Sequence, residues 1–312
     1  MKPVITLAAL LALLGAASAP ATEVVNISYV KSPFNLQMIV MKDQALLEKE
    51  LALLGVTVNW PEINIGARQA QALATGDLDV GGVMNTSSII MAKGEGYPVK
   101  IIAGVARPSD VFALVAKKGG AASVGDLKGK TVAGPKGTVL HNLLAAALQK
   151  DGLRLADVNF VSMDIHQSFA ALQSGRVDAA LLAANAVIMA EKDGAKVLTT
   201  ATGLVEPKLV MAASENFIAR HPDRLKAVIA AHDKAWQWIV ENHQDALALG
   251  AKVQGLSLAE AEQLFAWSHF TQRLNASDIP GMEADLLFML ENDIMRNQVD
   301  IRDLILPQAL EE

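Results

Sequence analysis

The chain carries one short pattern twice, 99 residues apart, and this repeat restricts its possible folds more than any other feature. The sequence ALATGDLD starts at Ala72, and ALQSGRVD starts at Ala171. In each copy a helix ends at a glycine, and a short strand follows that is entered through an aspartate. Helix–turn–strand units are common, so chance similarity is one explanation. The other is a pair of similar α/β lobes that face a shared cleft.

Strands and helices alternate in the predicted order of elements. A strand over Val24–Val30 is followed by a helical pattern over Leu36–Leu54, and the order starts again after Asp110 with a strand over Val111–Ala116. This alternation argues for parallel sheets flanked by helices. From about Ser214 the pattern is helical, and we expect that part to pack around the first lobe.

The N-terminus has the pattern of a secretory signal peptide. An apolar stretch of about 14 residues, Val4–Ala17, follows a basic start and is too short to span a bilayer. Ala19-Pro20-Ala21 is a small-x-small cleavage site, and it is preferable to Ala17-Ser18-Ala19 because that site would leave a proline just after the cut. We therefore expect residues 1–21 to be removed, although an N-terminal anchor or a buried helix would also explain the pattern.

Cysteine is absent from all 312 residues. The chain can therefore have no disulfide, no thiolate metal site and no cysteine nucleophile. A lipid anchor on a cysteine behind the signal peptide is excluded in the same way. Together with the signal peptide, this composition indicates a free periplasmic protein.

Charge and motif content narrow the function further. The net charge is −6 and no run of Lys or Arg occurs, so nucleic acid is not an expected partner. The chain has no G-x-S-x-G motif, the loop 134–138 lacks the spacing of a phosphate-binding loop, and the six histidines are scattered. We therefore expect no enzyme activity, no metal and no cofactor.

Five segments, in order along nearly all of the mature chain, carry a family resemblance. They are ALATGDLDVGGVMNTSSII from Ala72, LKGKTVAGPKGTVLHNLLAAALQKDGL from Leu127, ALQSGRVDAALL from Ala171 with GAKVL from Gly194, ENFIARHPDRLKAVIAAHDKAWQWI from Glu215, and the closing IRDLILPQ. Together they resemble the nitrate, sulfonate and taurine branch of ABC-type substrate-binding proteins, which includes NMT1-like and aliphatic-sulfonate-binding members.

The resemblance implies an α/β protein with the type II periplasmic-binding-protein fold, in which two α/β lobes are joined by a two-strand hinge. Lobe I would comprise residues 22–107 and 205–312, and lobe II residues 108–204. The implied function is that of the periplasmic solute-binding component of an ABC importer. Such a protein is a monomer that closes on a small molecule, here a small oxyanion or an organosulfonate, and delivers it to a cognate permease in the inner membrane.

One short segment departs from the family pattern. Many relatives have an aromatic residue, an acidic residue and a proline after the strand of the second lobe, where this chain has Ala183-Ala184-Asn185-Ala186. The departure implies a small, mostly apolar wall with one amide, so the family's usual ligand contacts do not carry over directly. A neutral ligand is consistent with such a wall as well.

Polar residues at the ends of the predicted strands are the first ligand-binding candidates, because open α/β sheets bind ligands at their carboxyl edges. In the first lobe these residues are Asn85, Thr86 and Ser87, and in the second lobe the candidate is Asn185. Capping the following helix needs only one of the first three side chains. The surplus therefore suggests contact with a ligand.

The N-terminus of a predicted helix supplies a second group of candidates. Gly137 and Thr138 open a helix directly after a strand, where unpaired N–H groups hold anions without help from Lys or Arg. An ordinary threonine N-cap is the alternative. His141 lies nearby and could assist an anion or be structural. The first strand–helix loop adds Ser32 and Asn35, with Phe34 as an apolar lid.

Two other functions fit the same fold. One is a cytoplasmic biosynthetic enzyme of the menaquinone or thiamine-pyrimidine routes, but the signal peptide and the missing acid–base constellation argue against it. The other is a periplasmic ligand sensor, which would need a signalling module that the chain does not contain.

Overall fold

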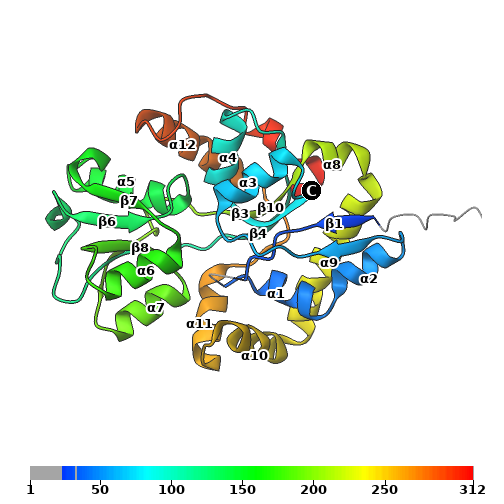
Figure 1. Cartoon of the computed structure of the whole chain (residues 1–312), viewed down its shortest axis with the longest axis horizontal. Helices are drawn as coiled ribbons and strands as arrows, with labels where there is room; N and C mark the ends of the chain where they lie inside the picture. Colours follow the sequence, from blue (N-terminus) through cyan, green and yellow to red (C-terminus); the bar gives the residue numbers. More distant parts are fainter. Residues whose placement is uncertain (1–22, 32–33, 312) are drawn as a thin grey trace, which may run out of the picture.

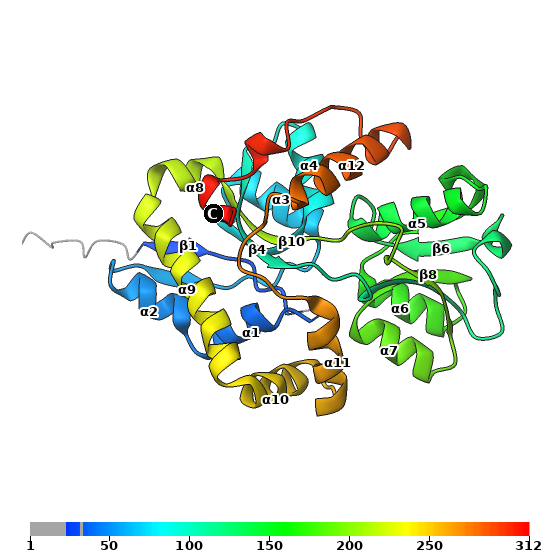
Figure 2. The same ribbon diagram turned by 180° about the vertical axis from the view of Figure 1, so that it is seen from behind.

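The computed structural model describes residues 23–31 and 34–311 and divides them into two lobes (Figure 1). One lobe contains β5 to β9 with α5 to α7, and the other contains the remaining helices and strands. Two chain segments connect the lobes and run side by side, as the view from behind also shows (Figure 2). The predicted signal peptide, residues 1–21, lies outside the described residues.

The first lobe is built on five short strands in the order β2-β1-β3-β10-β4. β1 pairs with β2 in parallel, continues into β3 through a parallel bridge between Ile27 and Val80, and β10 runs antiparallel to β3 and to β4. The strands are β1 (Val24–Asn26), β2 (Thr57–Asn59), β3 (Val80–Asn85), β4 (Val99–Ala106) and β10 (Leu209–Ser214).

The second lobe repeats this arrangement strand for strand, in the order β7-β6-β8-β5-β9. β6 runs parallel to β7 and to β8, and β5 runs antiparallel to β8 and to β9. The strands are β5 (Phe112–Ala116), β6 (Thr131–Gly134), β7 (Asn159–Ser162), β8 (Ala179–Ala183) and β9 (Lys196–Thr200). The prediction of two similar α/β lobes is therefore confirmed. The expectation of parallel sheets was wrong, because one strand in each lobe, β10 or β5, runs antiparallel to both of its neighbours.

The aspartate of the sequence repeat has the same structural role in both lobes. Asp79 Oδ2 accepts the backbone N–H of Asn26 at 2.8 Å, and Asp178 Oδ2 accepts the backbone N–H of Thr131 at 3.0 Å. In return, the N–H of each aspartate donates to the carbonyl of the same partner residue. Each aspartate thus joins the start of a central strand to its parallel neighbour, which explains why the pattern occurs twice.

Helices cover both faces of the sheets. In the first lobe they are α1 (Leu36–Asp43), α2 (Leu46–Ala52), α3 (Gly66–Thr75), α4 (Thr86–Gly94), α8 (Glu215–Arg220), α9 (Pro222–Glu241), α10 (His243–Gln254), α11 (Leu258–Ser268) and α12 (Asp278–Glu291), and in the second lobe they are α5 (Val139–Lys150), α6 (Ile165–Gln173) and α7 (Asn185–Lys192). The C-terminal helices pack on the first lobe as predicted, with α9 lying against α1 and α2.

One predicted helix is divided in the structure. The pattern over residues 36–54 forms two helices, because Ala45 has the left-handed conformation with φ of 49°. Alanine rarely adopts this conformation. None of the helices in the described part of the chain is long and apolar enough to cross a membrane.

Candidate functional site

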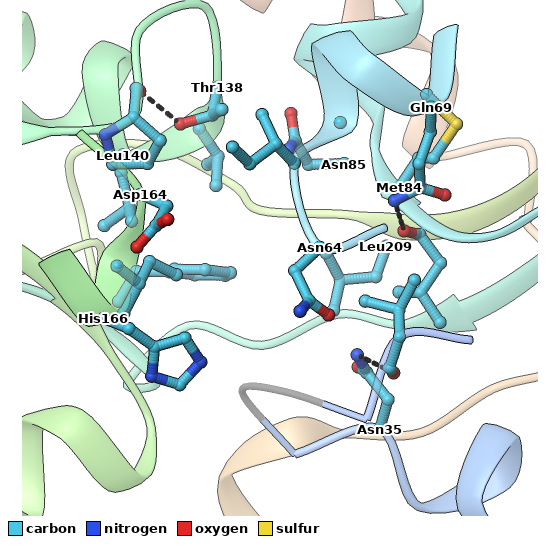
Figure 3. A pocket seen from close by; sticks show the side chains of 18 of the residues that line it. Asn35, Asn64, Gln69, Met84, Asn85, Thr138, Leu140, Asp164, His166 and Leu209 are labelled. Atoms are coloured by element: carbon cyan, nitrogen blue, oxygen red, sulfur yellow. Dashed lines mark hydrogen bonds between the residues drawn. The ribbon is translucent and has the colours of Figure 1, made fainter. Parts of the chain in front are cut away.

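A cavity lies between the two lobes (Figure 3), where the central strands β3 and β8 end and the antiparallel strands β5 and β10 begin. Its volume is about 90 Å³, which is room for a few waters or one small ligand. It is lined by Val30, Asn35, Asn64, Ile65, Gly66, Gln69, Val83, Met84, Asn85, Phe112, Pro135, Thr138, Val139, Leu140, Asp164, Ile165, His166, Asn185 and Leu209.

Six helices begin at this cavity, three from each lobe. Their first or capping residues belong to the lining: Asn35 (α1), Gly66 (α3), Asn85 (α4), Thr138 (α5), Asp164 (α6) and Asn185 (α7). The N-terminal N–H groups of a helix have no partner within the helix and carry a partial positive charge. The convergence of six such ends makes the cavity suitable for an anionic group.

The six helix starts differ in how their N–H groups are used. Asn85 Oδ1 accepts the N–H of Ser88 at 2.9 Å, and Asp164 Oδ1 accepts the N–H of Gln167 at 2.8 Å. Among the described residues, no side chain caps the other four helices, and Thr138 at the start of α5 instead donates its Oγ1 hydrogen to the carbonyl of Pro135 at 2.9 Å. The uncapped starts, among them those of α3, α5 and α7, therefore have backbone donors for a ligand.

The side chains of the lining supply few charges. Among the described residues that line the cavity, none is Lys or Arg, and the acidic side chain is Asp164. Gln69 is committed to the protein, since its Nε2 donates to the carbonyl of Val83 at 3.0 Å and its Oε1 accepts from Ser28 Oγ at 2.7 Å. An anion in this cavity would therefore be held by backbone N–H groups and side-chain amides, because the Thr138 hydroxyl already donates its hydrogen to Pro135.

Four residues predicted from the sequence lie in the lining: Asn35, Asn85, Thr138 and Asn185. Asn35 Nδ2 donates to the carbonyl of Val30 at 2.8 Å, and Asn185 Nδ2 donates to Gln254 Oε1 at 3.4 Å. Ser32 lies outside the described residues. Whether the four contact a ligand stays a prediction.

The other predicted residues lie outside the lining. Thr86 and Ser87 are buried beside the N-cap Asn85, and Ser87 Oγ accepts from Asn142 of the second lobe. Gly137 has φ of 69° and its carbonyl accepts from Ser88 Oγ at 3.0 Å. The surplus hydroxyl groups of α4 thus contact the opposite lobe in this structure.

Phe34 does not form a lid in the structure. It is buried and packs against Phe270, with the ring centroids 6.5 Å apart, and it also lies close to Gly250. Burial of the whole ring in the first lobe explains this placement, because the ring removes more apolar surface from water there than over an open cleft.

His141 supports the loop before α5 and is not in the lining. Its ring stacks on Phe160 with the centroids 4.6 Å apart, and its Nδ1 accepts the N–H of Gly137 at 3.4 Å. Burial, assisted by the charge of Lys136, lowers the pKa of His141 to about 4. The imidazole is therefore neutral at pH 7 and brings no positive charge towards an anion.

This lowered pKa predicts an acid-sensitive stability. Below pH 6.5 the unfolded chain binds the His141 proton while the folded chain does not, so the free energy of unfolding falls as the pH drops towards 4. The contribution should be about 2 kcal/mol between pH 7.5 and pH 5. Urea unfolding of the wild type and of His141→Phe, which keeps an aromatic ring on Phe160, measures the difference. An equal pH dependence in both proteins would contradict the prediction.

Sequence reasoning missed Asn64, Gln69, Asp164 and His166, all of which line the cavity. The 99-residue repeat could have pointed to two of them, Asp164 and His166. α3 starts at Gly66 and α6 starts at Ile165, 99 residues later, so the residues around the start of α6 correspond to those around the start of α3. The same offset relates the start of α4 at Thr86 to the start of α7 at Asn185.

The segment that departs from the family pattern has an unusual backbone. Ala184 has φ of 47° and ψ of −118° directly before Asn185, a conformation that costs a residue with a side chain about 1–3 kcal/mol. Its N–H donates to the carbonyl of Val111 at 2.8 Å. This conformation places the start of α7 at the cavity, although the residue before it is not glycine.

Comparisons with known proteins agree with this geometry. A family model described as NMT1/THI5 like matches residues 54–246. The taurine-binding periplasmic protein of Escherichia coli (strain K12) is 32% identical over 192 residues, which are 60% of this chain and 59% of that protein. The chain thus matches about three fifths of that relative's length.

Solved structures match over a longer range. The periplasmic aliphatic sulphonate binding protein SsuA from Escherichia coli has a TM-score of 0.75 and 25% sequence identity, with 92% of this chain and 98% of that chain covered. The desulfurization enzyme DSZB has a TM-score of 0.65 and 14% identity, with 92% and 97% covered. At that identity the likeness to the enzyme is one of fold alone.

Proposed function

Because the chain belongs to the NMT1/THI5-like family, we propose that it is the periplasmic solute-binding component of an ABC importer. It binds a small organosulfonate or oxyanion between its lobes. The observation that carries this proposal is the convergence of six helix N-termini on an interlobe cavity whose described lining holds no Lys or Arg. This arrangement suits an anionic group that is recognised by N–H donors.

Binding proceeds by closure of the lobes. The ligand touches residues of both lobes, such as Asn85 from the first and Thr138 from the second, and therefore stabilises the closed arrangement over the open one. Lobe I comprises residues 22–107 and 205–312, and lobe II comprises 108–204. The two connecting segments between them act as the hinge.

The site binds and does not catalyse. Besides amides and apolar side chains, the described lining contains the Asp164 carboxylate, the His166 imidazole and the Thr138 hydroxyl, and this hydroxyl donates to the carbonyl of Pro135 and not to a base. Relatives with similar sequences include a taurine-binding periplasmic protein and a putative aliphatic sulfonates-binding protein. Cysteine chemistry is not available to the chain, since it has no cysteine.

The partners and the location follow from the same proposal. The signal peptide over residues 1–21 directs the chain to the periplasm, where it acts as a monomer and delivers its ligand to a permease in the inner membrane. The periplasmic relatives support this location.

A thermal-shift screen of residues 22–312 tests the proposal. The panel contains taurine, short alkanesulfonates, nitrate, bicarbonate and an uncharged sulfone as a control. A ligand at about 100 times its dissociation constant stabilises the protein by roughly 2.7 kcal/mol, which raises the melting temperature by several degrees. Shifts with sulfonates that are absent with the sulfone support the proposal. No shift with any anion would contradict it.

Asp164 predicts which sulfonates bind most tightly. Its carboxylate lines the cavity while it caps α6, so it attracts an ammonium group and repels a second anion. We expect taurine to bind about tenfold more tightly than ethanesulfonate, which lacks the amino group. In Asp164→Asn this preference should disappear, because asparagine caps equally well but carries no charge.

Isothermal titration of both ligands measures the preference. Asp126→Asn is the matched control, because Asp126 accepts from Ser123 in the same lobe without lining the cavity. A taurine-to-ethanesulfonate ratio that is the same in all three proteins would show that Asp164 does not contact the amino end of the ligand.

A further inference from the structure

The two lobes touch directly through buried polar groups of α4 and α5. Ser88 Oγ donates to the carbonyl of Gly137 at 3.0 Å, and Asn142 Nδ2 donates to Ser87 Oγ at 3.1 Å. Ser87 is 1% exposed, Ser88 3% and Asn142 0%. We call these two hydrogen bonds the α4–α5 latch.

The residues of the latch are different from the residues that line the cavity. None of its four residues lines the cavity, whereas the N-cap residues of the same two helices, Asn85 and Thr138, do. The first turns of α4 and α5 therefore have two separate faces. One face surrounds the ligand space, and the other joins the lobes.

Apolar side chains of the first lobe pack beside the latch. Gly137 lies against Met91 of α4, whose sulfur would be 2.9 Å from a Cβ at this position. Ala145 of α5 is packed in the apolar cluster that contains Leu286 and Met289 of α12. On this side of the lobe junction both α4 and α12 thus contact α5 (Figures 1 and 2).

The opposite side of the junction is held more weakly. There Lys192 of α7 forms an ion pair with Glu260 of α11, but the lysine side chain is 64% exposed. Asn185 donates to Gln254 at 3.4 Å, a long hydrogen bond. Exposed ion pairs contribute little to stability, so this side should separate first when the lobes open.

One feature limits the strength of the latch. Within the part of the chain that the structure describes, Asn142 Oδ1 is buried without a hydrogen-bond partner. An unsatisfied buried carbonyl opposes closure, because water would bind it in an open form. The latch therefore favours closure without making it permanent.

We propose that the α4–α5 latch holds part of the ligand-free protein in the closed arrangement, so that Ser87, Ser88 and Asn142 act as positioning residues for the binding site. The inference rests on the proposed function, in which closure of the lobes binds the ligand. The apparent dissociation constant equals the intrinsic one divided by the fraction of competent protein. A latch that raises this fraction therefore raises affinity without touching the ligand.

Distance measurement on the ligand-free protein tests the inference. Because the chain has no cysteine, Glu191→Cys on α7 and Glu262→Cys on α11 provide the only two labelling sites, across the side that opens. Double electron–electron resonance between spin labels should show a short and a long distance in the latched protein. In Ser88→Ala the ratio of the short-distance population to the long-distance population should fall roughly 3- to 10-fold, because one hydrogen bond is lost.

Two further variants complete the design. Ser87→Ala removes the other latch bond and should act like Ser88→Ala. Ser268→Ala is the matched control, because this buried serine donates to Leu264 within α11, and it should leave the ratio unchanged. A single long distance without ligand, or one ratio in all four proteins, would overturn the inference.

The distance measurement and the ligand-binding test of the proposed function can fail independently of one another. The distances are measured without ligand, so a short population that depends on the latch would stand even if no sulfonate bound. Conversely, sulfonate binding by a protein that is fully open without ligand would retain the function and remove the latch.

Discussion

Replacing Gly82 by alanine is expected to lower the free energy of unfolding by about 3 kcal/mol or more. A Cβ at this position would lie 2.3 Å from the carbonyl oxygen of Ser28 and 2.5 Å from Met38 Cε. The carbonyl cannot move away, because Ser28 is bonded to β3 through its own N–H, which donates to Val80 at 3.0 Å, and through its Oγ, which accepts from Gly82 at 2.8 Å.

The effect would reach the cavity as well as the core. Val83, the next residue of β3, lines the cavity, and its carbonyl accepts from Gln69. Urea unfolding monitored by circular dichroism measures the loss. Gly125→Ala is the control, since the nearest atom to its Cβ would be 3.6 Å away. A loss below about 1 kcal/mol in Gly82→Ala would show that β3 shifts to make room.

The fold could be predicted from the sequence where a local pattern corresponds to a single structural role. The paired aspartates, Asp79 and Asp178, each join two strands, so the repeat could be read directly as two lobes. The break at Ala45 could not be predicted, because alanine is the best helix former and nothing local marks the left-handed turn. With this turn both α1 and α2 pack against α9, and the sequence does not reveal this contact.

The sequence predicted only some of the residues that line the cavity, because it does not show which way each side chain points. Polar residues after a strand can be recognised, but neighbouring residues at a helix start point in directions about 100° apart. Asn85 therefore lines the cavity, whereas Ser87 and Ser88 face α5. The sequence alone does not indicate which lobe each side chain faces, because that depends on how the lobes approach one another.

Replacing Asn85 by aspartate should reduce the affinity for an anionic ligand by two to three orders of magnitude. Two like charges about 4 Å apart repel by about 4 kcal/mol at an effective dielectric constant near 20, and the described lining offers no Lys or Arg to offset the new charge. The fold should tolerate the change, since aspartate can still accept the N–H of Ser88 and suits a helix N-terminus.

Asn85→Ser separates charge from contact, because serine also caps the helix but is neutral. It should cost an anionic ligand no more than about tenfold, the value of one amide contact. Isothermal titration with the sulfonate that gives the largest thermal shift compares the two variants. If both variants bind it within threefold of one another, then no negative group of the ligand lies near the start of α4. The anion would then have to be held at another helix start that lines the cavity, such as the uncapped starts of α3, α5 and α7.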